Sequence, residues 1–250
     1  MEKLTEFHTQ VVSILERIQT TQLINIEKLA SIIAKKTVEG GLLFGFGTGH
    51  SHVIAEELYI RAGGLFTAKG ILEPEFMLHG TKWKSTALER IEGISKSILE
   101  LNGVRSKDVI IVISNSGRNA VPIEMAIEAK KMGLVVICIT NMAHSNSIKS
   151  RHSSGKRLFE VSDYILDNCG VPGDCTIGFP DERYNFGATS TITGAYLIQL
   201  LVAQIIVKIK EMGEIPPVML SSNLDGNDEY NEELLTSYLT KFPELEALLK

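Results

Sequence analysis

Cysteine is scarce in this sequence of 250 residues. Its three cysteines, Cys138, Cys169 and Cys175, are too few and too scattered for a disulfide framework. A basic excess is also missing, since the formal net charge is −5. A protein whose main partner is nucleic acid needs cationic side chains that neutralise phosphates, so we predict no nucleic-acid partner. A small anionic ligand requires only a local positive site and agrees with this charge.

No apolar run has the length that a transmembrane helix needs. The longest, 192–207, is interrupted by Gly194, Gln199 and Gln204, and it falls short of the ~20 residues of a membrane span. The first 29 residues are amphipathic with interspersed acids, unlike a signal peptide. We therefore expect a cytoplasmic protein that has no membrane partner.

Two nucleotide-binding signatures are absent from the glycine-rich segment 45–50. Its sequence, GFGTGH, lacks the third glycine of the dinucleotide fingerprint G-x-G-x-x-G, and the G-K-[ST] of a P-loop does not follow. The histidines lack the tight spacing of metal ligands. We accordingly predict neither a cofactor nor a metal.

The stretch 109–125 contains the most informative pattern. Five apolar, mostly β-branched residues at 109–113 predict a strand that is buried on both faces, as in parallel sheets. The strand runs directly into the turn SNSGRN at 114–119, and a helical pattern with Pro122 in its first turn follows. Free N–H groups at a helix start favour an anion such as phosphate. Ser and Asn are also ordinary helix caps, so the turn alone leaves both interpretations open.

The segment 42–64 repeats this plan. A strand is predicted at 42–46, and a glycine loop at 47–51 leads into a helix that we expect to end at Gly63 and Gly64. Two such units in one chain suggest two loops that hold one ligand at the carboxyl edge of a sheet.

Strands and helices alternate along the rest of the chain. We expect strands at 65–72, 134–140 and 164–167, helices at 83–101 and 188–210, and a long irregular loop at 168–185. This pattern predicts an α/β fold with a three-layer, doubly wound parallel sheet. A helical extension (1–37) precedes the main domain (38–210), and a tail (211–250) follows. The extension and the helix 188–210 offer surplus apolar surface, so we predict a homodimer or homotetramer.

Four segments, in order over roughly residues 38–210, resemble the sugar isomerase (SIS) family of phosphosugar-binding domains. Residues 47–51 match the G-x-G-x-S loop of that family, and 114–119 are similar to its phosphate loop S-x-S-G-x-[TS], with Asn119 in place of the hydroxyl. Residues 139–141 resemble the end of its next strand, and 188–191 resemble the start of the helix that closes its sugar site. The tail from Pro216 resembles only uncharacterised members. The resemblance implies a flavodoxin-like fold that binds a sugar phosphate.

The resemblance also implies roles for individual residues. Ser114, Ser116 and Asn119 would hold the phosphate with help from the N–H of Asn115, and Thr48 and Ser51 would contact the sugar. The other expected members of the binding site are Gly47, Gly49, His50, Gly117, Thr189 and Ser190.

The catalytic base is expected to be a carboxylate. Phosphoheptose isomerase and the muramic acid phosphate etherase, which this chain resembles, carry a glutamate on the helix after the first loop. An ungapped comparison places that glutamate at Arg61, one turn beyond Glu57, and residues four apart share a helix face, so we predict Glu57 as the base. Residues 74–80 are similar to the P-x-E-x-x-H-G segment of arabinose 5-phosphate isomerase, with the acid displaced by one position to Glu75. Glu75 is therefore the alternative base, and His79 the acid for ring opening.

We expect a sugar-phosphate (aldose–ketose) isomerase on this basis. An amino-sugar-phosphate lyase or etherase and a non-catalytic regulatory module that binds a sugar phosphate remain alternatives. Residues 1–37 contain several acids and lack a basic helix-turn-helix, which disfavours a transcription factor.

Overall fold

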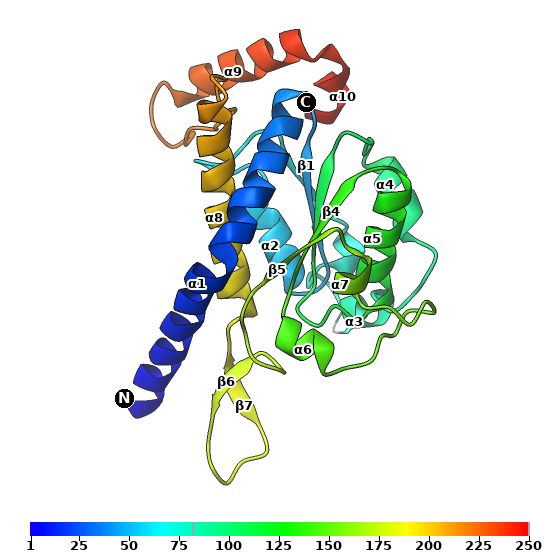
Figure 1. The fold of residues 1–250 in the computed structure, drawn as a ribbon, viewed down its shortest axis with the longest axis vertical. Helices are drawn as coiled ribbons and strands as arrows, with labels where there is room; N and C mark the ends of the chain where they lie inside the picture. Colours follow the sequence, from blue (N-terminus) through cyan, green and yellow to red (C-terminus); the bar gives the residue numbers. More distant parts are fainter. Residues whose placement is uncertain (82, 250) are drawn as a thin grey trace.

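Five parallel strands form the centre of the structure, a computed structural model that describes residues 1–81 and 83–249 (Figure 1). Their order is β2-β1-β3-β4-β5, and every neighbouring pair is parallel. Helices cover both faces of the sheet, which confirms the doubly wound α/β fold. The strands of the sheet are β1 (Leu43–Gly47), β2 (Ala68–Ile71), β3 (Val109–Ile113), β4 (Val135–Thr140) and β5 (Tyr164–Asp167).

The remaining elements comprise ten helices, two short 3₁₀ turns and a separate pair of strands, counted over the described ranges. The helices are α1 (Glu2–Val38), α2 (Ser51–Leu58), α3 (Lys84–Leu88), α4 (Ser95–Leu101), α5 (Ala120–Lys131), α6 (Met142–Asn146), α7 (Leu158–Val161), α8 (Ser190–Glu211), α9 (Asn227–Lys241) and α10 (Glu246–Leu249). The others are η1 (Pro74–Phe76), η2 (Pro243–Leu245), β6 (Cys175–Gly178) and β7 (Asn185–Ala188).

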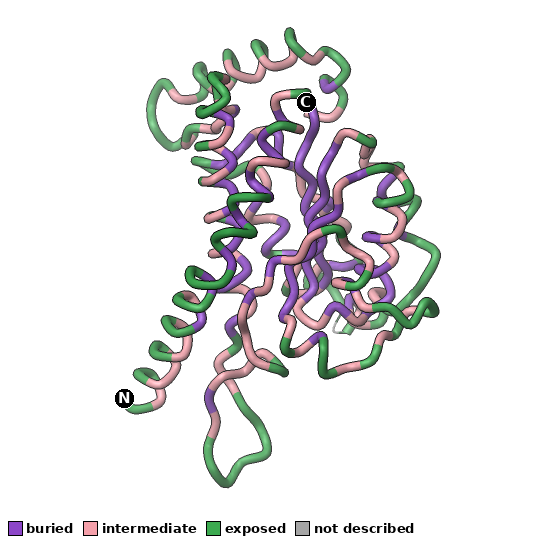
Figure 2. Tube along the Cα trace, viewed as in Figure 1, coloured by how far each residue is buried: buried purple, intermediate pink, exposed green. Residues whose placement is uncertain are grey.

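The two helical layers are separated by the alternation of side chains along each strand. In β3, Val109, Ile111 and Ile113 pack with the layer that contains α1, α2 and α8. Ile110 and Val112 pack with the opposite layer, which contains α4 and α5. The whole strand is buried (Figure 2), as its continuous apolar run predicted.

The predicted helix at 83–101 is wrong, because the structure has two short helices there. The break falls at 89–94, where Gly93 adopts a φ of +95°. The carboxylate of Glu124 in α5 accepts hydrogen bonds from the N–H groups of Gly93, Ile94 and Ser95, at and just before the first residue of α4. A side chain from another helix therefore stabilises the second helix start. The helix after the first loop is also shorter than expected and ends at Leu58.

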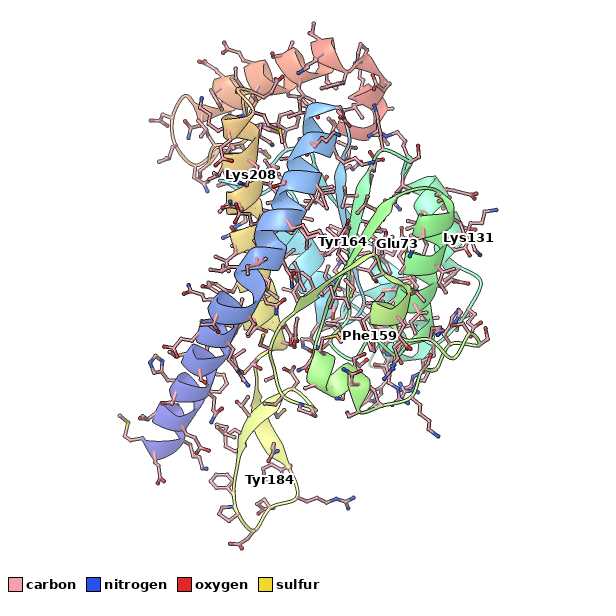
Figure 3. The ribbon with its side chains drawn as sticks, in the orientation of Figure 1. Glu73, Lys131, Phe159, Tyr164, Tyr184 and Lys208 are labelled. Carbon is pink, nitrogen blue, oxygen red and sulfur yellow. The ribbon has the colours of Figure 1, made fainter. Side chains whose placement is uncertain are left out.

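The segment 168–185 is not wholly irregular, since β6 and β7 pair there as an antiparallel hairpin. Phe179 and Phe186 stack across it with ring centroids 5.5 Å apart. At Gly187, a Cβ would lie 2.8 Å from the ring of Phe7 in α1, so this helix packs directly on the hairpin. The hairpin projects beside the first half of α1 with Tyr184 near its tip (Figure 3).

The tail packs at the amino edge of the sheet and contains the 15-residue helix α9. The Tyr238 hydroxyl donates to the carbonyl oxygen of Thr37 at 3.0 Å. The Phe242 ring lies against Gly40, whose φ is +79° and where a Cβ would come within 2.6 Å of that ring. The tail is therefore joined to the end of α1.

The sequence analysis expected no apolar segment of transmembrane length, but α8, at 22 residues, is the one helix within the described ranges that is long and apolar enough to cross a membrane. It packs along α1 and α2, its inward face belongs to the hydrophobic core, and 44% of its most apolar stretch is buried. Its length and composition are therefore weak evidence for a membrane span.

Candidate functional site

The first loop and the turn after β3 lie side by side at the carboxyl edge of the sheet. β1 and β3 are neighbours, and Gly47 is the register partner of Ile113, so both segments leave the sheet at the same level. The chain proceeds from β1 outwards to β2 and from β3 outwards to β4. The two segments therefore flank the point at which the winding direction reverses, where ligands bind in open α/β sheets.

A cavity of about 580 Å³ opens between these two segments. Its walls come from 48–51, from Ser114, Asn115, Ser116 and Asn119, from parts of 77–89, and from His144, Gly173 and Asp174. This volume is in the range of small-molecule sites. The cavity contains many hydroxyl and amide groups, which suit a polyhydroxylated ligand.

The 114–119 turn is held in place by its neighbours. The Ser114 hydroxyl accepts the N–H of Gly117 at 3.2 Å, and Gly117 has a φ of +60°. A Cβ at Gly117 would approach the Ser145 hydroxyl to 2.9 Å, so a side chain has no room there. Asn115 accepts a hydrogen bond from the Asn168 amide at 2.8 Å. The Ser116 hydroxyl lines the cavity and has no protein partner within the described part of the chain. It is therefore free to donate to a ligand.

The first loop is tied to the segment that follows β2. The N–H of Gly49, whose φ is +56°, lies 2.8 Å from the carbonyl oxygen of Phe76 and 3.1 Å from the Ser85 hydroxyl. The Thr48 hydroxyl donates to Glu89 Oε2 at 2.6 Å. Gly47 does not line the cavity, but a Cβ there would lie 2.4 Å from the Ser51 carbonyl oxygen. Glycine is thus required at position 47 by packing.

Glu89 is a cavity residue that the sequence analysis missed. It was expected on a continuous helix, but it follows α3 in the break, where its carbonyl oxygen accepts the N–H of Val121 in α5 at 3.0 Å. Gly93, four residues later inside the helical pattern, was the signal that could have indicated the break.

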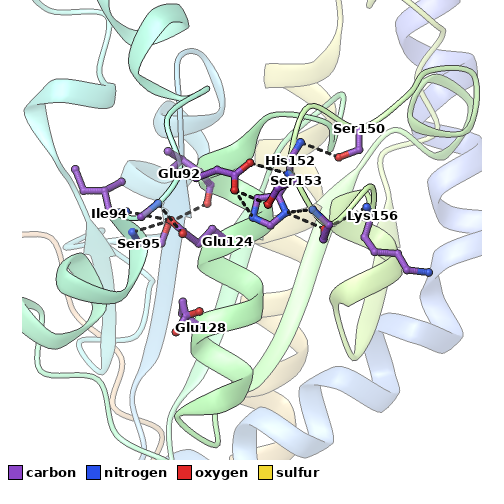
Figure 4. Close-up of polar contacts among 12 residues, drawn as sticks. Glu92, Ile94, Ser95, Glu124, Glu128, Ser150, His152, Ser153 and Lys156 are labelled. Carbon is purple, nitrogen blue, oxygen red and sulfur yellow. Dashed lines mark hydrogen bonds and ion pairs between the residues drawn. The ribbon is translucent and has the colours of Figure 1, made fainter.

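Two further carboxylates fix the loop that carries Glu89 (Figure 4). Glu124 accepts the N–H of Gly93 at 2.7 Å and that of Ser95 at 3.0 Å. Burial raises the pKa of Glu124, but these hydrogen bonds and that of Ile94 outweigh it and lower the pKa overall. Glu92 accepts both the N–H and the hydroxyl of Ser153, at 2.7 and 2.6 Å. The loop is therefore bound to α5 and to the segment 150–156.

Asp174 accepts hydrogen bonds from Thr189 and Ser190, the two helix-start residues that were predicted as members of the binding site. Its carboxylate accepts their N–H groups at 3.0 and 2.8 Å and the Ser190 hydroxyl at 2.6 Å. Asp174 lines the cavity, whereas Thr189 and Ser190 do not. They therefore hold an acidic wall residue at the start of α8.

His144 also lines the cavity. Burial lowers its pKa, and the nearby Arg118 lowers it further against the opposing effect of Asp174, which favours the neutral ring. Its Nδ1 accepts the N–H of Gly173 at 3.3 Å, which assigns the ring proton to Nε2.

The predicted catalytic residues do not line the cavity. The carboxylate of Glu57 accepts a hydrogen bond from Gln199 in α8 and pairs with Arg61, both at 2.8 Å. Glu75 pairs with Lys84, and His79 is exposed. The structure therefore brings the two predicted loops together but places all three expected catalytic side chains elsewhere.

The strand order, the two loops and the polar cavity define a doubly wound α/β protein with a candidate ligand site at its switch point. Residues 6–141 match the family model described as the SIS domain, and the chain belongs to this family. The UPF0309 protein of Halalkalibacterium halodurans is 48% identical to this chain over 90% of it and 93% of that relative. The UPF0309 protein of Thermoanaerobacter pseudethanolicus is 39% identical over 94% and 97% of the two chains.

Two solved structures share the fold. A phosphoheptose isomerase from Francisella tularensis gives a TM-score of 0.55 at 18% identity and covers 82% of this chain and 96% of that one. The sugar isomerase domain of an RpiR transcription factor from Sphaerobacter thermophilus gives 0.52 at 15% identity and covers 95% and 98%. The same fold thus occurs in an isomerase and in a regulator, so the choice of function depends on the site residues.

Proposed function

We propose that the cavity binds a sugar phosphate and that the protein isomerises it between aldose and ketose forms. The observation that carries this proposal is a carboxylate, Glu89, that lines the same cavity as an anion-binding turn at the start of α5. Membership of the SIS family supports the phosphosugar part of the proposal. The isomerase part rests on the chemistry of the side chains.

The phosphate would lie on the 114–119 turn. Unpaired N–H groups and the helix dipole favour negative charge at the start of α5. The hydroxyl of Ser116 and the amide of Asn119 add side-chain donors at the same place. The sugar would then extend towards Thr48, Ser51 and Glu89.

Isomerisation requires a base that moves a proton between neighbouring carbon atoms. We propose Glu89 for this role, in place of Glu57 and Glu75. Its Oε2 accepts the Thr48 hydroxyl, which leaves Oε1 for the carbon-bound proton. His144, with its proton on Nε2, can donate to a sugar oxygen during ring opening, the role predicted for His79.

Changing Ser116 to alanine tests the phosphate site. The variant should bind a hexose phosphate more weakly by ~1–3 kcal/mol, the range for a hydrogen bond to a charged group. The affinity for the free hexose should not change. Isothermal titration calorimetry measures these affinities, and a panel of pentose, hexose, heptose and amino-sugar phosphates identifies which sugar phosphate binds. Equal weakening of the phosphate and the free sugar would refute the assignment.

We also propose that the protein is a homo-oligomer, at least a dimer. Large apolar side chains are exposed on α1, on the hairpin and on α8; examples are Leu4 (69%), Ile24 (85%), Phe179 (46%) and Ile192 (42%). Burying such surface favours association. Light scattering at micromolar concentration should give at least twice the chain mass of 27.5 kDa, and a value near the single mass contradicts the proposal.

The cytoplasmic location also stays a proposal, supported by the amphipathic α1.

A further inference from the structure

We infer that Arg151 is a positioning residue for the phosphate turn: it fixes the Asn119 carboxamide so that the amide nitrogen is available to the ligand. This inference rests on the proposed phosphate site. It explains how asparagine can serve where the family pattern has a hydroxyl. The argument uses the contacts of Asn119, the anchoring of Arg151, and the charges around both.

The Asn119 side chain is committed to the cavity and to Arg151. It is 8% exposed, lines the cavity, and does not cap α5 with a side-chain hydrogen bond. Its Oδ1 accepts a hydrogen bond from Arg151 Nη1 at 2.8 Å. Arginine has only donors, so the atom that it contacts must be the carboxamide oxygen. The amide nitrogen is then the other end, and it has no protein partner among the residues described.

Arg151 is itself anchored to the turn. Its backbone N–H donates to the carbonyl oxygen of Arg118, a residue of the turn, at 2.8 Å. Two residues later, the N–H and hydroxyl of Ser153 bind Glu92 in the loop that carries Glu89 (Figure 4). The segment around Arg151 is therefore joined to both sides of the site, which keeps its guanidinium group at Asn119.

The surroundings add positive charge at this point. Burial lowers the pKa of Arg151, and the neighbouring guanidinium groups of Arg118 and Arg90 lower it further, against the effect of Glu89. Three arginines thus lie near one another in a chain whose net charge is −5. Because Nε of Arg118 is buried without a partner in the described ranges, this side chain also has unused donor capacity. Such a cluster favours a dianionic phosphate over a neutral sugar.

The side-chain chemistry explains why Asn119 needs Arg151. A hydroxyl rotates freely and both donates and accepts, so threonine or serine at position 119 adapts to a phosphate without help. A carboxamide has distinct oxygen and nitrogen ends, and its oxygen would repel an anion. Arg151 should therefore matter more when residue 119 is asparagine than when it is threonine.

A double-mutant cycle measures this dependence, with inorganic phosphate as the probe and its dissociation constant as the readout. Arg151→Ala should weaken phosphate about tenfold, as expected for lost support of a charged hydrogen bond. In the Asn119→Thr background, or in Asn119→Ser if that variant folds poorly, the loss should be smaller by about threefold or more. Lys149→Ala is the matched control, because it removes one exposed charge from the same segment, and it should change affinity less than twofold, roughly the effect of a remote surface charge.

The possible outcomes are distinct. If Arg151→Ala weakens phosphate equally in both backgrounds, Arg151 supplies only charge and the inference is wrong. If Arg151→Ala has no more effect than Lys149→Ala, the inference is also wrong, while the phosphate site survives. If the wild-type protein binds no phosphate or sugar phosphate at all, the proposed function fails and the inference fails with it.

Discussion

Changing Glu89 to glutamine should reduce turnover of the sugar phosphate by a factor of about 10²–10⁴, the usual contribution of a general base. The amide cannot accept the proton from carbon, yet its oxygen can still accept the Thr48 hydroxyl and keep the first loop in place. Substrate affinity should therefore remain close to that of the wild type. Exchange of the substrate's carbon-bound proton in D₂O, followed by NMR, measures the step directly.

Matched controls make the same chemical change outside the cavity. Glu57→Gln and Glu75→Gln remove carboxylates that pair with Arg61 and Lys84, and both variants should keep most of the wild-type exchange rate. If Glu57→Gln abolishes exchange and Glu89→Gln does not, the sequence-based choice was right and the proposed base is wrong. If sugar phosphates bind and none of them exchanges, the protein is a binding module of the regulatory type.

Changing Asp108 to alanine should lower the free energy of unfolding by about 3–5 kcal/mol, the range for breaking a buried ion pair. Asp108 is fully buried and forms an ion pair with Arg105. Its carboxylate also accepts the N–H groups of Leu42, at 2.9 Å, and of Arg105, at 2.7 Å. The variant would leave these donors and the guanidinium group without their acceptor. Urea denaturation should show a lower midpoint with an unchanged slope.

Lys107→Ala provides the comparison for Asp108→Ala. Lys107 immediately precedes Asp108 and pairs with Glu244 at 2.8 Å, but both side chains are substantially exposed. An exposed pair contributes roughly 0–1 kcal/mol, so this variant should unfold almost as the wild type does. A loss of less than about 1 kcal/mol in Asp108→Ala, which is the exposed-pair range, would show that the buried network is not a main support of the fold.

Much of the fold could be predicted because its signals are local. The apolar run of β3 identified a buried strand, and β5 was predicted with the bounds that the structure has. The meeting of the two loops followed from a general rule, since ligand sites of parallel sheets occur where the winding direction reverses. The strand register then places the two loops at the same level of the sheet edge, because Gly47 lies opposite Ile113.

The candidate base and the hairpin could not be predicted because distant residues determine them. Glu89 lies in the break between α3 and α4, and the helix start that follows this break is stabilised by Glu124, more than thirty residues further along the chain than Glu89. The hairpin lies against Phe7, which precedes Gly187 by 180 residues in the sequence. Glu57 was chosen by its spacing on a helix, but that spacing gave no information about Gln199 in α8. Gln199 donates a hydrogen bond to the Glu57 carboxylate and holds it against α8.

The first turn of α5 has a consequence for the size of substrate. It begins at the 114–119 turn, and at Val121 it also binds the backbone of Glu89. The proposed phosphate site and the backbone of Glu89 are therefore both attached to the first turn of α5. Under the proposed function, this arrangement fixes the distance between the phosphate and the base. That distance determines how many carbon atoms can lie between the phosphate and the carbonyl group of the substrate. Sugars of the wrong chain length would then bind by their phosphate but present the wrong carbon to the base.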